Sequence, residues 1–87
     1  MTLLTAKIIM MAYANKAFDA FTIKLGRKIQ ELREAKGYSQ EKLAYLSDMD
    51  RVSIGYIEQG RRSPKLSTLF VLAKQLDVSV ADFFTGL

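Results

Sequence analysis

The residues best suited to chemistry lie on one side of segment 51–59. Its outward side is predicted to hold Arg51, Val52, Ser53, Gly55 and Tyr56. Arginine can pair bidentately with guanine O6 and N7, and valine can pack on a thymine methyl group; a good bidentate pair discriminates between bases by roughly 1–3 kcal/mol. An arginine, a serine and a tyrosine near the start of a helix therefore suit reading of a DNA major groove. Alternatively, Arg51 reaches only a phosphate or solvent, Ser53 is an ordinary surface serine, and Tyr56 packs its ring on the domain surface.

A basic cluster follows directly. Arg61, Arg62 and Lys65 bring three positive charges with no negative charge among them, and residues 1–36 carry seven basic and three acidic side chains. The segment between these zones, 37–60, is net negative. Basic flanks of this kind suit a module that grips phosphates at its edges. The alternative is that they form a solvated loop and a solvated helix face.

Composition limits the remaining function classes. The 87 residues have no cysteine and no histidine, and their formal net charge is +4. The commonest general base, the Ser-His and Cys-His pairs and the usual zinc ligands are thereby lost. We therefore expect binding rather than catalysis, with no metal, no cofactor and no small-molecule ligand. The positive charge favours a polyanionic partner, either nucleic acid or an anionic membrane surface.

Helices are expected to position these residues. Phe21, Leu25, Ile29 and Leu32 recur at helical spacing after Phe18, and Gly37 should end that helix. The expected N-caps of the following helices are Ser39, Asp50, Ser67 and Ser79. The prediction is one all-α domain of five short helices over residues 18–87, preceded by an N-terminal extension over residues 1–17.

Two of the expected helices, 40–47 and 51–59, lie only three or four residues apart. This is the spacing of a helix-turn-helix, here over residues 40–59. Small Ala44 allows the second helix to cross closely over the first, with Leu43, Ile54 and Ile57 turned inward. A carboxylate facing DNA would repel phosphates, so Glu58 is interpreted as structural.

At this point the sequence resembles the phage repressor and Cro type of helix-turn-helix regulators, the XRE family. The resemblance covers residues 22–84. It rests on Leu25-Gly26, Ile29, Leu32-Arg33, Gly37-Tyr38-Ser39-Gln40-Glu41-Lys42-Leu43-Ala44, Ile54, Ile57-Glu58, Gly60, Arg62-Ser63-Pro64, Leu69, Leu72-Ala73, Leu76 and Val78-Ser79-Val80. The stretch from Asp50-Arg51 to Ile57-Glu58 also resembles restriction-modification controller proteins. One departure is Asp48, at a turn position where the family usually has glycine.

The resemblance implies a lambda-repressor-like fold and assigns roles to individual residues. It places Arg51, Val52, Ser53 and Tyr56 at base-reading positions, and it places Ser39, Gln40, Arg61, Arg62 and Lys65 on the DNA backbone. It further implies an ion pair between Arg33 and Glu58 that fixes two helices. Asp48 should adopt a left-handed backbone, which aspartate tolerates better than most residues.

The C-terminal residues carry more large apolar groups than a small domain can hide. Val78, Val80, Phe83, Phe84 and Leu87 are therefore expected to face, in part, a second copy of the chain. In the family such helices pair about a two-fold axis and set half-sites one DNA turn apart. The alternative is that both phenylalanines belong to the core.

Residues 1–17 lie outside the resemblance. Their apolar run is too short to span a bilayer and its basic flank too poor for a signal peptide. We expect an N-terminal arm or an extension of the first helix, packed across a dimer; translation from Met10 or Met11 is the alternative.

These observations together predict a cytoplasmic, homodimeric and autoregulated transcriptional regulator that binds a pseudo-palindromic double-stranded DNA operator through helix 51–59. No enzyme activity and no membrane association are expected. Two alternatives remain open: an antitoxin of a toxin-antitoxin pair, and a protein-interaction module whose helix-turn-helix no longer binds DNA.

Overall fold

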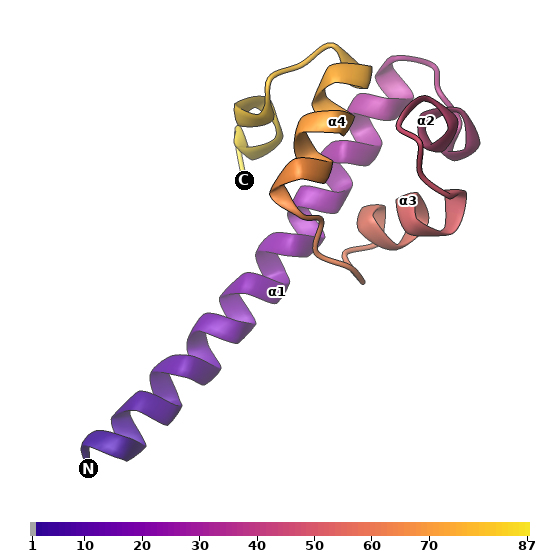
Figure 1. The fold of residues 1–87 in the computed structure, drawn as a ribbon. Helices are drawn as coiled ribbons and strands as arrows, with labels where there is room; N and C mark the ends of the chain where they lie inside the picture. The colour runs from indigo at the N-terminus through magenta and orange to yellow at the C-terminus, as the bar shows by residue number, and fades with distance from the viewer. Residues whose placement is uncertain (1) are drawn as a thin grey trace.

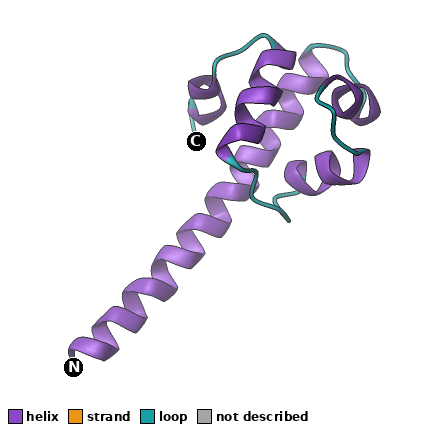
Figure 2. Cartoon of the chain, viewed as in Figure 1, coloured by secondary structure: helices purple, strands orange, loops and turns teal. Residues whose placement is uncertain are grey.

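The structure is a computed structural model that describes residues 2–87. In these residues the chain forms α1 (Leu3–Ala35), α2 (Gln40–Leu46), α3 (Arg51–Glu58), α4 (Leu66–Leu76) and a final 3-10 helix, η1 (Val80–Phe84) (Figure 1). Figure 2 shows helices and loops only over the part described. The all-α prediction is confirmed. The count of five short α-helices is wrong, because the last element is a 3-10 turn and the first is long.

Helix α1 begins at Leu3, far before the expected start near Phe18, and has 33 residues. The hydroxyl of Thr2 caps it by accepting a hydrogen bond from the Thr5 backbone N–H at 3.1 Å. No break separates residues 3–17 from the rest of α1. We call residues 3–21 of α1 the extension and residues 22–87 the body. The extension projects from one end of the body, which gives the chain extents of 52 × 25 × 19 Å.

Side-chain caps explain where most of the other helices start. Ser39, Asp50 and Ser79 each accept a hydrogen bond from the backbone N–H three residues later, as predicted. Ser67 was expected to cap the fourth helix, and this prediction is wrong. Helix α4 starts at Leu66 with Lys65 as its N-cap residue and no side-chain cap hydrogen bond.

The core of the body is formed by one apolar face from each helix. Its fully buried side chains include Ile29, Leu43, Ile54, Leu72 and Phe83. Burying an aliphatic side chain of this size contributes roughly 1.5–3 kcal/mol, so these residues supply much of the stability. Where α1 crosses α3, Gly26 allows backbone contact. A Cβ on Gly26 would lie 2.7 Å from the Glu58 carbonyl oxygen and closer still to that of Ile57.

Among the described residues, no helix combines the length and hydropathy needed to cross a bilayer.

Candidate nucleic-acid interface

Helices α2 and α3 form the predicted helix-turn-helix. The turn between them contains Asp48 at φ 54°, the left-handed backbone expected there. The Met49 N–H then donates to the Ala44 carbonyl at 2.9 Å, which closes the turn. Ala44 is buried beneath α3, together with Leu43 of the same helix. The turn therefore fixes the position of α3 through local hydrogen bonds and close packing.

The outward face of α3 begins with two exposed side chains. Arg51 lies in the first turn, and its Nε is 4.0 Å from Glu41 Oε1, with both side chains largely in solvent. An exposed pair at this separation is weak, so the guanidinium remains free to bind elsewhere. Val52 beside it is 57% exposed. Gly55 was expected on this face but is buried, because the Gln40 side chain lies over it, with its amide oxygen 3.8 Å from where a glycine Cβ would stand.

Ser53 joins the cap of α3 to the following loop. Its hydroxyl donates to Asp50 Oδ2 at 2.9 Å and accepts a hydrogen bond from Arg62 Nη1, also at 2.9 Å. Its backbone N–H donates to Asp50 Oδ1 at 2.7 Å. These hydrogen bonds lower the pKa of Asp50: the Ser53 backbone contributes most, followed by the Ser53 hydroxyl, and the charge of Arg62 adds a smaller effect. The hydroxyl of Ser53 thus holds Arg62 in place.

Tyr56 holds the same loop from the other side. Its carbonyl accepts hydrogen bonds from the backbone N–H groups of Arg61 at 2.9 Å and Arg62 at 3.3 Å. The guanidinium carbons of Arg61 and Arg62 also lie over the Tyr56 ring, 5.2 and 5.4 Å from its centroid, respectively. Cation–π contacts at exposed sites contribute about 0.5–1 kcal/mol each. The ring, which is 37% exposed, therefore organises two arginines in a surface depression that it lines with them.

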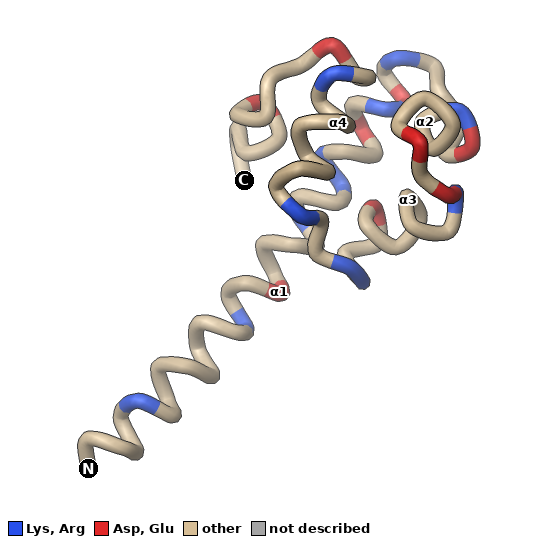
Figure 3. Tube along the Cα trace, in the orientation of Figure 1, with Lys and Arg blue, Asp and Glu red and all other residues tan. Residues whose placement is uncertain are grey.

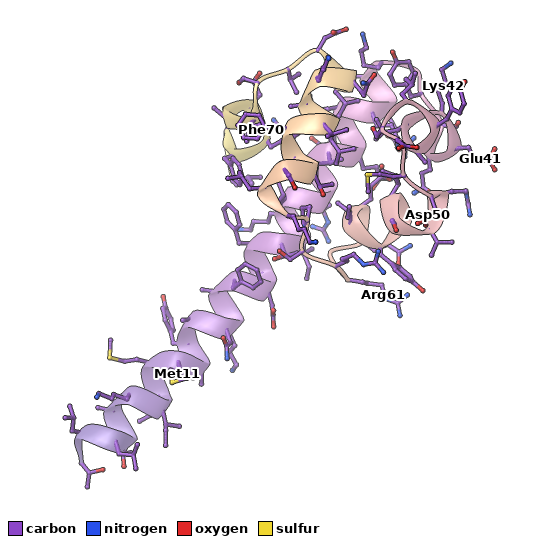
Figure 4. The ribbon with its side chains drawn as sticks, in the orientation of Figure 1. Met11, Glu41, Lys42, Asp50, Arg61 and Phe70 are labelled. Atoms are coloured by element: carbon purple, nitrogen blue, oxygen red, sulfur yellow. The ribbon has the colours of Figure 1, made fainter. Side chains whose placement is uncertain are left out.

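The loop after α3 carries three basic residues and no acidic one. Figure 3 shows its basic residues grouped between α3 and α4, next to the end of α1 that enters the body. Figure 4 shows Arg61 pointing outward below α3, with Asp50 at the start of that helix. Lys65 continues the cluster at the start of α4, where it is exposed. Arg61, Arg62 and Lys65 are thus brought together with the outward face of α3.

The ion pair expected between Arg33 and Glu58 is present and buried. Arg33 donates from Nε to Glu58 Oε2 at 2.6 Å and from Nη2 to Oε1 at 3.0 Å. Its Nη1 also donates to the Tyr38 carbonyl at 2.7 Å. The hydrogen bonds to Glu58 raise the pKa of Arg33 further above its usual value, against the opposing effect of burial. Glu58 therefore faces inward and ties α3 to α1.

Gln40 connects this pair to the first motif helix. Its Nε2 donates to Glu58 Oε1 at 3.0 Å, so α1, α2 and α3 all meet at one carboxylate. Ser39, the residue before it, uses its hydroxyl to accept from the Lys42 N–H at 3.0 Å. Both residues lie at the start of α2, where the Gln40 side chain reaches Gly55 and Glu58 of α3.

The five C-terminal apolar residues do not share one environment. Phe83 is fully buried in the body, so its expected place in a contact with a second copy is wrong. Phe84 is 39% exposed and its ring stacks on that of Phe21 with centroids 5.7 Å apart. Val78, Val80 and Leu87 pack against the core and are partly buried. Only part of this set is therefore available to another chain.

Sequence reasoning missed the hydrogen bonds that join Asp50, Ser53 and Arg62. The capping distance from Asp50 to Ser53 was a usable signal, but the approach of Arg62 depends on the path of the loop. Among residues 2–87, no group of three or more aspartate or glutamate side chains is arranged to hold a metal ion.

The sequence matches a family model and several known regulatory proteins. The family model described as Helix-turn-helix, HTH_3, matches residues 29–83. The chain is 39% identical over 61 residues to control protein C.SmaI of Serratia marcescens, covering 70% of this chain and 73% of that protein. It is 38% identical over 60 residues to the HTH-type transcriptional regulator PuuR of Escherichia coli, covering 69% of this chain. The chain matches only 32% of the length of PuuR.

Two solved structures share the fold. The restriction-modification controller protein C.AhdI from Aeromonas hydrophila superposes with a TM-score of 0.73 at 43% identity, covering 75% of this chain and 98% of that one. The master regulator for biofilm formation SinR, solved in complex with DNA, superposes with a TM-score of 0.66 at 30% identity, covering 69% of this chain and 97% of that one.

Proposed function

Because the chain belongs to the XRE type of helix-turn-helix family, whose members are transcriptional regulators, we propose that it binds a double-stranded DNA operator and controls transcription. One observation carries this proposal: Arg51 and Val52 stand exposed in the first turn of α3, and the same helix anchors two arginines of the following loop through Ser53 and Tyr56. A base-reading pair flanked by phosphate-binding groups is the arrangement that groove recognition needs.

The roles divide between specificity and affinity. Arg51 pairs with a guanine edge and Val52 packs on a neighbouring thymine methyl group. Tyr56 and Ser53 position Arg61 and Arg62, which bind phosphates together with Lys65. Gln40, held by Glu58, and Ser39 approach the backbone at the start of α2. Backbone contacts fix the register of α3 and make binding depend on salt.

The regulator acts as a homodimer on a pseudo-palindromic operator in its own upstream region. The exposed ring of Phe84 and the partly buried Val78, Val80 and Leu87 supply the contact between copies. The similarity to controller proteins over most of the length of C.SmaI and C.AhdI supports a small autoregulated circuit.

Selection of bound sites from random duplex DNA tests this proposal, because it reports sequence, symmetry and half-site spacing together. We expect two inverted half-sites about one DNA turn apart. Arg51→Ala should weaken binding to the selected site by about 5- to 150-fold and relax specificity at one base position. Arg27→Ala is the matched control, since it removes an exposed arginine that lines a depression with the C-terminal residues 85–87 and not with α3.

Arg62→Ala tests the phosphate contacts separately. It should weaken all sequences about equally and reduce the slope of log K against log salt by about 1. If no sequence is enriched, or if Arg51→Ala behaves like Arg27→Ala, base reading by α3 is excluded.

A further inference from the structure

The extension carries an apolar stripe that nothing in the described chain covers. Every residue from Leu3 to Phe21 is exposed except Ala6, which is partly buried. Nine large apolar side chains in this stretch expose between 39% and 75% of their surface. Among them are Leu4, Ile8, Met11 and Phe18, each 55–68% exposed. A monomer seldom leaves a run of large apolar side chains of this length open to water, so these residues mark an interaction surface.

The stripe has the spacing of a paired helix. Leu4, Ile8, Met11, Asn15 and Phe18 follow one another at steps of four, three, four and three residues. This is the heptad pattern of helices that pack along their length. The same steps continue to Thr22, Leu25 and Ile29, which the body buries. One face of α1 is therefore covered by its own domain in the second half and uncovered in the first.

We propose that the uncovered half of this stripe pairs with the same stripe of a second copy of the chain, with the two extensions running antiparallel. The body covers the stripe from Thr22 onward, and the extension projects beyond it (Figure 1). A parallel partner would bring its own body to the same level of the stripe, and the two bodies would collide. An antiparallel partner places its body at the opposite end.

The stripe is also self-complementary in this direction. With the two-fold axis at residue 13, Ile8 lies opposite Phe18 of the partner and Met11 lies opposite Asn15 of the partner. Leu4 then reaches the edge of the other body near Thr22. Leu3 to Thr22 spans about 28 Å at 1.5 Å per residue, and each extension is covered over this length. Figure 4 shows Met11 midway along the extension with no other element beside it.

Charge favours a second copy over a lipid surface. The extension carries only Lys7, Lys16 and Asp19. A helix that lies in a membrane interface has a strongly basic polar face, which two lysines and one aspartate do not provide. The low charge also means that two extensions repel each other little. A lone helix of this length is marginal in water, so pairing stabilises its helical state.

The sequence offers a matched pair of variants, because the large apolar residues occur as doublets. Ile8 and Met11 lie on the stripe, whereas the adjacent Ile9 and Met10 lie off it and are similarly exposed. The double variants Ile8→Glu/Met11→Glu and Ile9→Glu/Met10→Glu therefore have identical composition and charge. Analytical ultracentrifugation of the full chain should show the first variant at half the wild-type mass and the second at the wild-type mass. Circular dichroism should show lost helix in the first variant while the body stays folded.

Cross-linking tests the direction, because the chain has no cysteine. Ile8→Cys mixed with Phe18→Cys should form a mixed disulfide dimer, and each variant alone should not. Self-cross-linking of each variant would overturn the antiparallel arrangement.

The mass measurement can also contradict the proposal. Equal masses for wild type and Ile8→Glu/Met11→Glu would overturn the pairing, as would a halved mass in both double variants. A third outcome would assign the stripe to lipid instead of a second copy. In it, wild type and Ile8→Glu/Met11→Glu have equal masses, and wild type sediments with anionic phosphatidylglycerol vesicles. The antiparallel pairing holds the two bodies at opposite ends, so it is a contact separate from the one proposed through Phe84. None of these readouts involves DNA, so a failure of DNA binding and a failure of the pairing are distinguishable.

Discussion

Arg33 and Glu58 form a bidentate pair between α1 and α3, with hydrogen bonds of 2.6 and 3.0 Å and only 9% and 2% of their side-chain surfaces exposed. Because both charges are buried, the removal of either leaves the other without its counter-ion. The pair thus fixes the orientation of α3 without itself facing a ligand.

Loss of this pair should destabilise the body strongly. Arg33→Ala leaves the Glu58 carboxylate buried and uncompensated, and we expect the free energy of unfolding to fall by about 3–5 kcal/mol. Arg33→Lys should be intermediate, because an ammonium cannot make the two parallel hydrogen bonds. Urea denaturation measures the free energy of unfolding of both variants. Lys36→Ala is the control: it removes an exposed pair with Asp77, and its transition should hardly move. A comparable loss in this control would show that burial of the Arg33 pair is not decisive.

Two glycines should respond oppositely to the same substitution. Gly26→Ala places a Cβ against the backbone carbonyl oxygens of Ile57 and Glu58, so α1 and α3 must separate. Overpacking of this kind costs about 1–3 kcal/mol, more than the gain in helix propensity. Gly55→Ala meets only side-chain atoms at 3.8 Å or more and should be neutral or stabilising by up to about 1 kcal/mol. Thermal unfolding of the two variants compares them directly, and equal melting temperatures would contradict the close crossing.

The turn residue Asp48 should accept glycine with a gain in stability. Its φ of 54° is unfavourable for a residue with a side chain. Asp48→Gly should raise the free energy of unfolding by about 0.5–1 kcal/mol, and Asp48→Val should lower it, since a β-branched residue fits this region worst. DNA affinity should stay constant in Asp48→Gly. A destabilised glycine variant would show that the aspartate side chain matters more than the backbone.

Asp50 should make stability depend on pH in acid. Its folded-state pKa is lowered below the ordinary value of 3.8, so its contribution is complete above that value. The contribution is lost as the pH falls through the lower, folded-state pKa. Asp50→Asn retains an acceptor for the Ser53 N–H but cannot titrate. Urea midpoints of both proteins should differ by a constant amount above about pH 5 and converge as the pH falls below 4. Parallel curves down to pH 2 would contradict the assignment.

Local chemistry explains which features of the fold were predictable. Ser39, Asp50 and Ser79 cap helices through their own side chains, and Asp48 bends the turn through its own backbone, so each is visible in the sequence. The start of α4 was not visible in the sequence, because its N-cap residue Lys65 makes no side-chain cap hydrogen bond. The length of α1 was missed because large apolar residues such as Ile9 and Met10 lie off the stripe as well as on it, so the stripe does not stand out in the sequence of residues 3–17.

The candidate site was predictable to a similar degree. The positions of Arg51, Val52 and Tyr56 follow from helical spacing around buried Ile54 and Ile57. The burial of Phe83 beside exposed Phe84 depends on how η1 packs on α1, and the contact of Arg62 with Ser53 depends on a loop path. Neither can be read from local spacing, because both are set by tertiary packing.

The uninterrupted course of α1 sets a rotational phase between its two ends. The same rod touches α3 at Gly26 and carries the extension outward. One residue inserted between Phe18 and Thr22 would turn the extension by about 100° and advance it by about 1.5 Å relative to α3. A seven-residue insertion would nearly restore the phase while lengthening the rod by about 10 Å. The angle and the reach of the extension are therefore separately adjustable properties of this fold.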